Sequence, residues 1–305
     1  MNYFKNYFRR VFSYVLSSLS PKPLEQLVCV GMVRNEIDII DIWLDHLLSI
    51  FDHVIIIDHC SNDGTREYLA QRASSSTRLC VEFHDENAHK QSELMTEATK
   101  KVSREVSNGW LFFMDADEFI MGMSPSALRR ILARRSAAAS VRFSWANCYL
   151  DPSDAVLTPQ TTLKGWRTGG RISKSALNLR FASGLALVKQ GNHGFRWKKR
   201  PFLHNEIVGS FVHLPVRTPE QLQKKLQHAI PADLAASEDG GGISIHWHEL
   251  SSNCDFNRGI ELEKVVFEYG MNVRTSEAPL IYRPNRENIH ASLAELVAFD
   301  AEARG

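Results

Sequence analysis

Three stretches decide the fold of this chain: LVCVGMV at residues 27–33, HVIII at residues 53–57 and WLFFM at residues 110–114. Each is a short apolar run, typical of a strand that is buried on both faces of a sheet. A further strand is predicted at residues 78–83. Helical patterns separate these strands, at residues 37–50, 65–73 and 92–106. The alternation predicts an α/β fold, with right-handed βαβ units around a mostly parallel central sheet and helices on both faces.

Polar side chains follow three of the predicted strands at the point where each strand ends. They are Arg34, Asn35 and Glu36 after the first strand, Asp58 and His59 after the second, and Asp115, Asp117 and Glu118 after the last. The carboxyl ends of parallel strands meet at one edge of a sheet, and ligands of open α/β folds bind there. The sequence therefore predicts a common site at this edge.

The acidic segment DAD, residues 115–117, is the most chemically specific of these groups. Alternate residues of an extended segment point to the same side, so Asp115 and Asp117 are expected to share one face. Two such carboxylates repel each other unless a cation lies nearby, and Mg²⁺ and Mn²⁺ bind carboxylates together with substrate phosphates. The segment predicts a metal–diphosphate site; the alternative is a solvated acidic turn.

The ordered blocks LVCVGMVRNE, HVIIIDHCSNDGT and WLFFMDADEFI resemble the successive blocks of family 2 glycosyltransferases, in particular a bacterial branch. The resemblance covers residues 27–122 and continues more weakly through Gly191-Asn192-His193 and the HLPVR segment at residues 213–217. It implies a Rossmann-like GT-A fold with a loop-rich C-terminal acceptor region. It also implies an enzyme that transfers a sugar, with inversion, from a nucleotide sugar to a glycan or lipid-linked acceptor in surface polysaccharide synthesis.

The resemblance assigns roles to individual residues. Asp58 is expected at the base or ribose of the nucleotide, in a pocket walled by Arg34, Asn35 and Glu36. The Mn²⁺ or Mg²⁺ ligands are expected to be Asp115, Asp117 and His213, with Arg217 on a phosphate. Many relatives carry two acids where this chain has Asp58-His59, so His59 is expected to shift the base preference away from uridine.

The base that deprotonates the acceptor hydroxyl is not identified by a motif, because the chain has no clear x-Glu-Asp segment. The candidates are His193, Glu206 and Asp151. For each of them the alternative is a surface or loop-capping residue.

The chain divides by pattern into four parts. Residues 24–122 form the predicted nucleotide-sugar half and residues 123–250 the acceptor half. The stretch at 146–215 is predicted to be loop-rich, with short strands such as Leu185–Val188 and Ile207–Val212. Residues 251–305 are predicted to be a helical extension with helices near 255–269 and 288–302. Residues 1–23 carry four basic residues and no acid, with aromatic residues at helical spacing. This predicts an amphipathic helix on an anionic membrane surface; packing on the domain or a partner subunit is the alternative. Its longest uncharged stretch is too short to span a bilayer, which needs about 20 apolar residues.

Composition narrows the function classes further. The 305 residues carry a net charge of +1, which gives no reason to expect a nucleic-acid partner. Five scattered cysteines without a CxxC pair argue against structural zinc and a disulfide framework. We therefore expect a cytoplasmic protein, peripheral at the inner face of the membrane. The segment His246-Trp247-His248-Glu249 lacks the spacing of zinc hydrolases.

Two other function classes stay open. A sugar-nucleotidyl transferase shares a similar sheet, although its Gly-rich basic loop after the first strand is missing from GMVRNE. A non-catalytic protein that binds nucleotide or glycan is the second alternative.

Overall fold

The computed structural model describes residues 26–85, 91–150, 156–167, 173–199, 206–227, 265 and 288–297. Of the predictions above, those for residues 1–23, Asp151 and residues 246–249 fall outside these residues, as does the helix predicted near 255–269 except for Val265.

The described strands form one ten-stranded sheet and one separate hairpin, β9–β10. The large sheet has the order β12-β7-β6-β8-β4-β1-β2-β3, with β11 paired to β6 and to β5. The strands of this sheet are β1 (Gln26–Val33), β2 (His53–His59), β3 (Leu79–His84), β4 (Gly109–Phe113), β5 (Glu118–Ile120), β6 (Ser140–Leu150), β7 (Thr162–Arg167), β8 (Ser173–Asn178), β11 (Ile207–His213) and β12 (Asn288–Ser292). The hairpin joins β9 (Leu185–Val188) to β10 (Phe195–Trp197).

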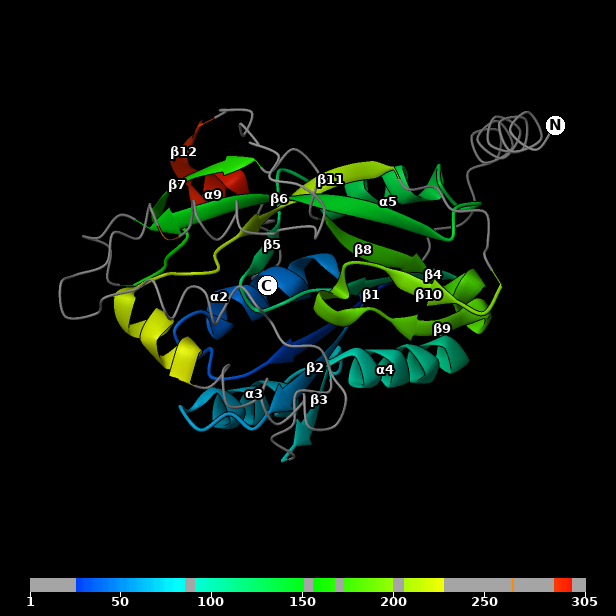
Figure 1. Cartoon of the computed structure of the whole chain (residues 1–305), viewed down its shortest axis with the longest axis horizontal. Helices are drawn as coiled ribbons and strands as arrows, with labels where there is room; N and C mark the ends of the chain where they lie inside the picture. The colour runs from blue at the N-terminus through cyan, green and yellow to red at the C-terminus, as the bar shows by residue number, and fades with distance from the viewer. Residues whose placement is uncertain are drawn as a thin grey trace, which may run out of the picture.

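Helices cover both faces of the sheet (Figure 1). They are α2 (Ile40–Ile50), α3 (Thr65–Ser74), α4 (Gln91–Glu105), α5 (Pro125–Ala133) and α9 (Leu293–Leu296), with the 3₁₀ turns η1 (Leu179–Gly184) and η2 (Gln190–Asn192) and a further helical stretch at residues 219–227. Side chains alternate between the two faces along each strand. In β4, Trp110 and Phe112 pack in the core beside α2 and α5, whereas Leu111 and Phe113 pack in the core beside α4.

The four strands β3-β2-β1-β4 are parallel, and the chain changes direction within them. It runs outward from β1 through β2 to β3, and then returns past β1 to β4. The loops that follow β1 and β4 therefore separate, and they leave room for a ligand at a topological switch point. Beyond β4 the sheet is mixed, because β8 joins β4 and β6 antiparallel to both.

The α/β class predicted from the sequence is confirmed, and the elements of residues 27–122 lie close to their predicted bounds. In the second half, the short strands predicted at Leu185–Val188 and Ile207–Val212 are present as β9 and β11, and the stretch at 146–215 also contains the end of β6 and all of β7 and β8. One expectation was wrong. The helix predicted at 288–302 begins only at Leu293, because Ser292 and Glu295 form a capping box there, and residues 288–292 pair with β7 as a strand.

Candidate active site

The loops after β1 and β2 are tied to each other at the edge of the sheet. The backbone N–H of Asn35 donates to the hydroxyl of Ser61 at 3.0 Å, and the N–H of Asn62 donates to Oδ1 of Asn35 at 2.8 Å. Asn35 and Cys60 both have positive φ values, 57° and 60°. Non-glycine residues in this region are uncommon and are often found where a backbone is held for function. The two loops therefore form one fixed wall.

Asp58, at the end of β2, is fully buried in this wall. Its Oδ2 accepts from Nε of Arg66 at 2.8 Å, whereas its Oδ1 is buried and has no hydrogen-bond partner. Nε and Nη1 of Arg34 are likewise buried without a partner. Buried polar groups are nearly always paired, so these orphan atoms indicate a polar ligand at this edge of the sheet. His59 is also buried.

Asp115 follows β4 and keeps part of its carboxylate exposed. Lys174 of β8 donates to Oδ2, while the side-chain amides of Asn192 and Gln91 approach Oδ1 at 3.2 and 3.5 Å. Burial opposes the charge of Lys174, but Asp115 and Glu118 raise its pKa. The lysine is therefore a fixed cation beneath Asp115.

The buried Glu118 fixes the geometry of the acidic turn at residues 115–118. Its Oε2 accepts from the backbone N–H of Asp115 at 3.1 Å, and its Oε1 accepts from Nε1 of Trp145 at 2.7 Å and lies 3.3 Å from Nζ of Lys174. Burial raises the pKa of Glu118 to about 8. Each of these partners can only donate, which favours the carboxylate form. Glu118 therefore supports the turn and does not face the ligand edge.

Asp117 lies between a lysine and a histidine. Its Oδ2 is 2.9 Å from Nζ of Lys225, and its Oδ1 is 3.8 Å from Nε2 of His213. His213 is placed by β11, which pairs with β5 and β6, and its ring stacks on Trp145 with centroids 4.1 Å apart. Nδ1 of His213 bonds Oδ1 of Asn147 at 2.8 Å. Burial lowers the pKa of His213 to about 4, so the ring is neutral at pH 7.

Arg217 is buried and its guanidinium is used within the protein. It binds Asp38 through Nε at 2.7 Å and through Nη2 at 2.9 Å, and Nη2 also contacts Glu36. The guanidinium is thus part of an internal ion pair, and its predicted contact with a phosphate stays a prediction. This pair anchors the segment after β11 to the loop after β1.

Of the two candidate bases that the structure describes, His193 lies next to the acidic group and Glu206 does not. The exposed ring of His193 lies edge-on to Trp145 with centroids 5.4 Å apart, and its Nδ1 is 3.2 Å from the carbonyl oxygen of Ser173. Glu206 precedes β11 at the end opposite His213, about 20 Å along an extended strand, and pairs with Arg135 at 2.6 Å. Glu206 is thus not part of this group.

Sequence reasoning missed several side chains of this site, among them Trp145, Asn147, Lys174 and Lys225. Three of them lie on β6 and β8, in or next to the stretch that we predicted to be loop-rich. A period-2 pattern in SVRFSWANCYL, residues 140–150, carries a signal for the longer strand. No local signal marks the two lysines as partners of the aspartates.

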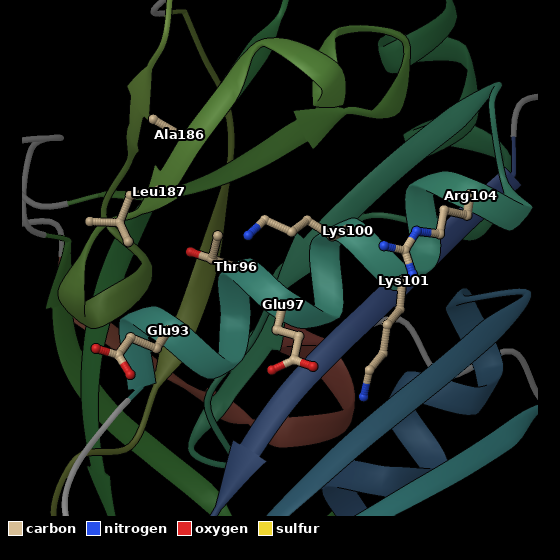
Figure 2. Close-up of a pocket in the computed structure, with 8 residues that line it drawn as sticks. All are labelled: Glu93, Thr96, Glu97, Lys100, Lys101, Arg104, Ala186 and Leu187. Atoms are coloured by element: carbon tan, nitrogen blue, oxygen red, sulfur yellow. The ribbon is translucent and has the colours of Figure 1, made fainter.

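A shallow hollow lies on the outer side of α4, against β9, and Figure 2 shows the side chains around it. Its residues are Glu93, Thr96, Glu97, Lys100, Lys101, Arg104, Ala186 and Leu187. Lys101 pairs with Glu82, and Thr96 bonds the backbone of Ser92 and Val188, so these polar groups have partners within the protein. The hollow does not include the acidic residues at the strand ends.

Together, the parallel strands with a switch point and the acidic turn after β4 define a class, the GT-A glycosyltransferase fold. Residues 30–170 match the model of glycosyl transferase family 2. Residues 30–170 are therefore family 2-like, within a fold of the GT-A type.

Two solved structures are distantly similar. One is the mannosyltransferase PcManGT from Pyrobaculum calidifontis in complex with GDP-Man and Mn²⁺, with 15% identity, a TM-score of 0.39 and coverage of 75% of this chain and 72% of that chain. The other is HddC from Yersinia pseudotuberculosis, with 9% identity, a TM-score of 0.36 and coverage of 62% of this chain and 95% of that chain. No curated protein matches the sequence. Over the residues that the structure describes, no helix is long and apolar enough to cross a membrane.

Proposed function

We propose that this glycosyltransferase transfers a sugar from a metal-bound nucleotide sugar to a hydroxyl group of a glycan or lipid-linked acceptor, with inversion. The observation that carries the proposal is the approach of His213 to Asp117. Because Oδ1 of Asn147 accepts from Nδ1 of His213, the neutral ring directs the lone pair of Nε2 toward Oδ1 of Asp117, 3.8 Å away. Two electron-rich atoms facing each other in a buried place are a suitable pair of ligands for a cation.

The fit to Mn²⁺ or Mg²⁺ involves two of the three predicted ligands. No group of three or more His, Cys, Asp or Glu side chains is arranged for a metal within the described part of the chain. Asp117 and His213 form a pair, whereas the carboxylate of Asp115 is held by Lys174 and two amides. Such ions commonly take one or two carboxylates and complete their coordination with substrate phosphates and water. A site made of Asp117, His213 and the diphosphate of the donor therefore suits Mn²⁺ or Mg²⁺.

The charge of Asp117 favours a cation as well. Burial alone would raise the pKa of Asp117, but Lys225 and Arg217 lower it, so this carboxylate is ionised. When bound, a divalent cation would pair with this carboxylate and stabilise the leaving diphosphate.

The nucleotide is proposed to bind along the wall formed by the loops after β1 and β2. The orphan Oδ1 of Asp58 can accept from an N–H of the base or a hydroxyl of the ribose, and the orphan N–H groups of Arg34 can donate to the same ligand. Asn35 and Glu36 hold the wall in place. The partly exposed Asp115 can accept hydrogen bonds from hydroxyl groups of the donor sugar. His59, which follows Asp58 at the end of β2, is buried behind this wall.

His193 is the proposed general base. A backbone carbonyl can only accept, so the contact with Ser173 places the proton on Nδ1 and the lone pair on Nε2. The ring packs over Gly191, where a Cβ atom would lie 2.7 Å from it. His193 can thus take the proton of an acceptor hydroxyl that approaches from the exposed side of the site. A role in surface polysaccharide synthesis at the inner membrane face, through residues 1–23, completes the proposal.

The metal site can be tested by the affinity for Mn²⁺ alone, measured by electron paramagnetic resonance. Removal of a group that only supports a metal ligand lowers metal affinity by about 10–100-fold. We expect Asp117→Asn and His213→Ala each to lower the affinity for Mn²⁺ by more than that. Glu206→Gln, which removes a carboxylate at the far end of the same strand, should leave the affinity unchanged. Unchanged binding in both site variants would overturn the metal assignment.

The donor can be identified by a thermal-shift screen of nucleoside diphosphates and nucleotide sugars, with and without Mn²⁺. A ligand that binds only the folded state raises the melting temperature in proportion to the logarithm of its concentration over Kd. Transfer or hydrolysis of the selected nucleotide sugar, lost in His193→Ala, would support an enzyme. Binding without any turnover would instead favour the non-catalytic alternative.

A further inference from the structure

Two lysines contact the two aspartates of the acidic turn, and they are held very differently. Lys174 is 1% exposed and pairs with both Asp115 and Glu118. The Lys225 side chain is 22% exposed; it pairs with Asp117 at 2.9 Å and lies 3.3 Å from the carbonyl oxygen of Pro215. Lys174 is thus enclosed between Asp115 and Glu118, whereas the Lys225 side chain is partly exposed and contacts Asp117 and the carbonyl oxygen of Pro215.

The position of Lys225 places it in competition with any cation at Asp117. The carboxylate that faces Nε2 of His213 through Oδ1 binds Nζ of Lys225 through Oδ2. A divalent ion on this carboxylate would be repelled by the ammonium a few ångströms away. The repulsion falls if the ammonium moves to another anion, and the four-carbon stem of a lysine allows such a movement.

We propose that Lys225 is a competing counter-ion of the metal site: its ammonium competes with the divalent cation for Asp117 and turns to the diphosphate of the donor when the cation binds. The proposal rests on the proposed function, since it takes Asp117 as a metal ligand. It gives Lys225 two opposed effects. The lysine weakens the binding of the metal alone, and it strengthens the binding of a diphosphate in the presence of the metal.

The test uses Lys225→Met, with Lys224→Met as its matched control. Both changes remove one positive charge from the helical stretch at residues 219–227, but Lys224 is exposed. The probes are Mn²⁺ alone and inorganic pyrophosphate at saturating Mn²⁺, measured by calorimetry on the full chain. We expect Lys225→Met to bind Mn²⁺ about tenfold more tightly, because all of Asp117 becomes available. We expect its affinity for pyrophosphate to fall about tenfold. Lys224→Met should match the unchanged protein in both.

The possible outcomes separate this proposal from the proposed function. If the unchanged protein does not bind Mn²⁺, or if Asp117→Asn does not weaken that binding, both are overturned. If Asp117→Asn loses Mn²⁺ but Lys225→Met binds it equally or less tightly, Lys225 only holds Asp117 in place and this proposal alone fails. Tighter Mn²⁺ binding with unchanged pyrophosphate affinity overturns the predicted contact with the diphosphate.

Discussion

At the scale of single residues, the site depends on side chains that set the protonation of others. In the proposed metal site, the ring of His213 can act as a ligand because one nitrogen is committed to Asn147 and the other faces Asp117. Outer groups of this kind fix the tautomer and orientation of histidine ligands. Asn147 lies directly beside His213 in the β6–β11 pairing, so the sheet itself brings the two together.

Asn147→Ala should weaken Mn²⁺ binding by about 10–100-fold, because the tautomer of His213 is no longer fixed. Asn147→Asp retains an oxygen that accepts from Nδ1, and it should bind Mn²⁺ at least as tightly as the unchanged protein. Calorimetry would measure both affinities, with a thermal melt to show that each variant is folded. Equal losses in the two variants would mean that the accepting oxygen of Asn147 is not what matters.

At the scale of elements, a buried histidine joins α2 to the strand that carries the acidic turn. Nε2 of His46 accepts from the backbone N–H of Ile120 in β5 at 2.9 Å, and Nε1 of Trp43 donates to the carbonyl oxygen of Glu118 at 3.0 Å. A strand as short as β5 has few ladder bonds of its own. Its position therefore depends on these contacts with α2 and on its pairing with β11.

This contact predicts a pH dependence of stability. Burial lowers the pKa of His46 to about 3, whereas an unfolded histidine has a pKa of about 6.5. Below pH 6.5 the unfolded state binds one proton more, so the stabilisation is complete above pH 6.5 and is lost as the pH falls toward 3. Between pH 6 and 4 the free energy of unfolding should fall more steeply than in His46→Gln, by about 1.4 kcal/mol per pH unit. Denaturant titrations at several pH values give the free energy of unfolding of both proteins. An equal fall with pH in the two proteins would contradict this prediction.

At the scale of the whole molecule, Arg217 connects parts that lie far apart in the sequence. Its partner Asp38 is 179 residues away, in the loop after β1. The pair joins the segment after β11 to the loop after β1. It also holds His213, four residues earlier, near Asp117.

Arg217→Met should lower the free energy of unfolding by about 3 kcal/mol, because it leaves Glu36, whose side chain is only 12% exposed, without its ion-pair partner. The partly exposed Asp38 adds little to this cost. The control is Arg135→Met, which removes the partner of Glu206. Because the Glu206 side chain is 41% exposed, the free energy of unfolding should fall by less than about 1 kcal/mol. Chemical denaturation of both variants gives the comparison. Similar costs would show that Arg217 does not act as a buried anchor.

The sequence by itself determined the parallel half of the fold and the places where its chemistry lies. Apolar runs and helical spacing are local patterns, and the end of a strand such as β4 can be read from the residues that form it. Asp58, Asp115 and Asp117 could therefore be predicted from position alone. Only the tertiary structure decided which charges meet there. Lys174 reaches Asp115 across 59 residues, His213 reaches Asn147 across 66, and Lys225 reaches Asp117 across 108. Contacts over such separations depend on how distant strands are ordered in the sheet, and no short stretch of sequence encodes that order.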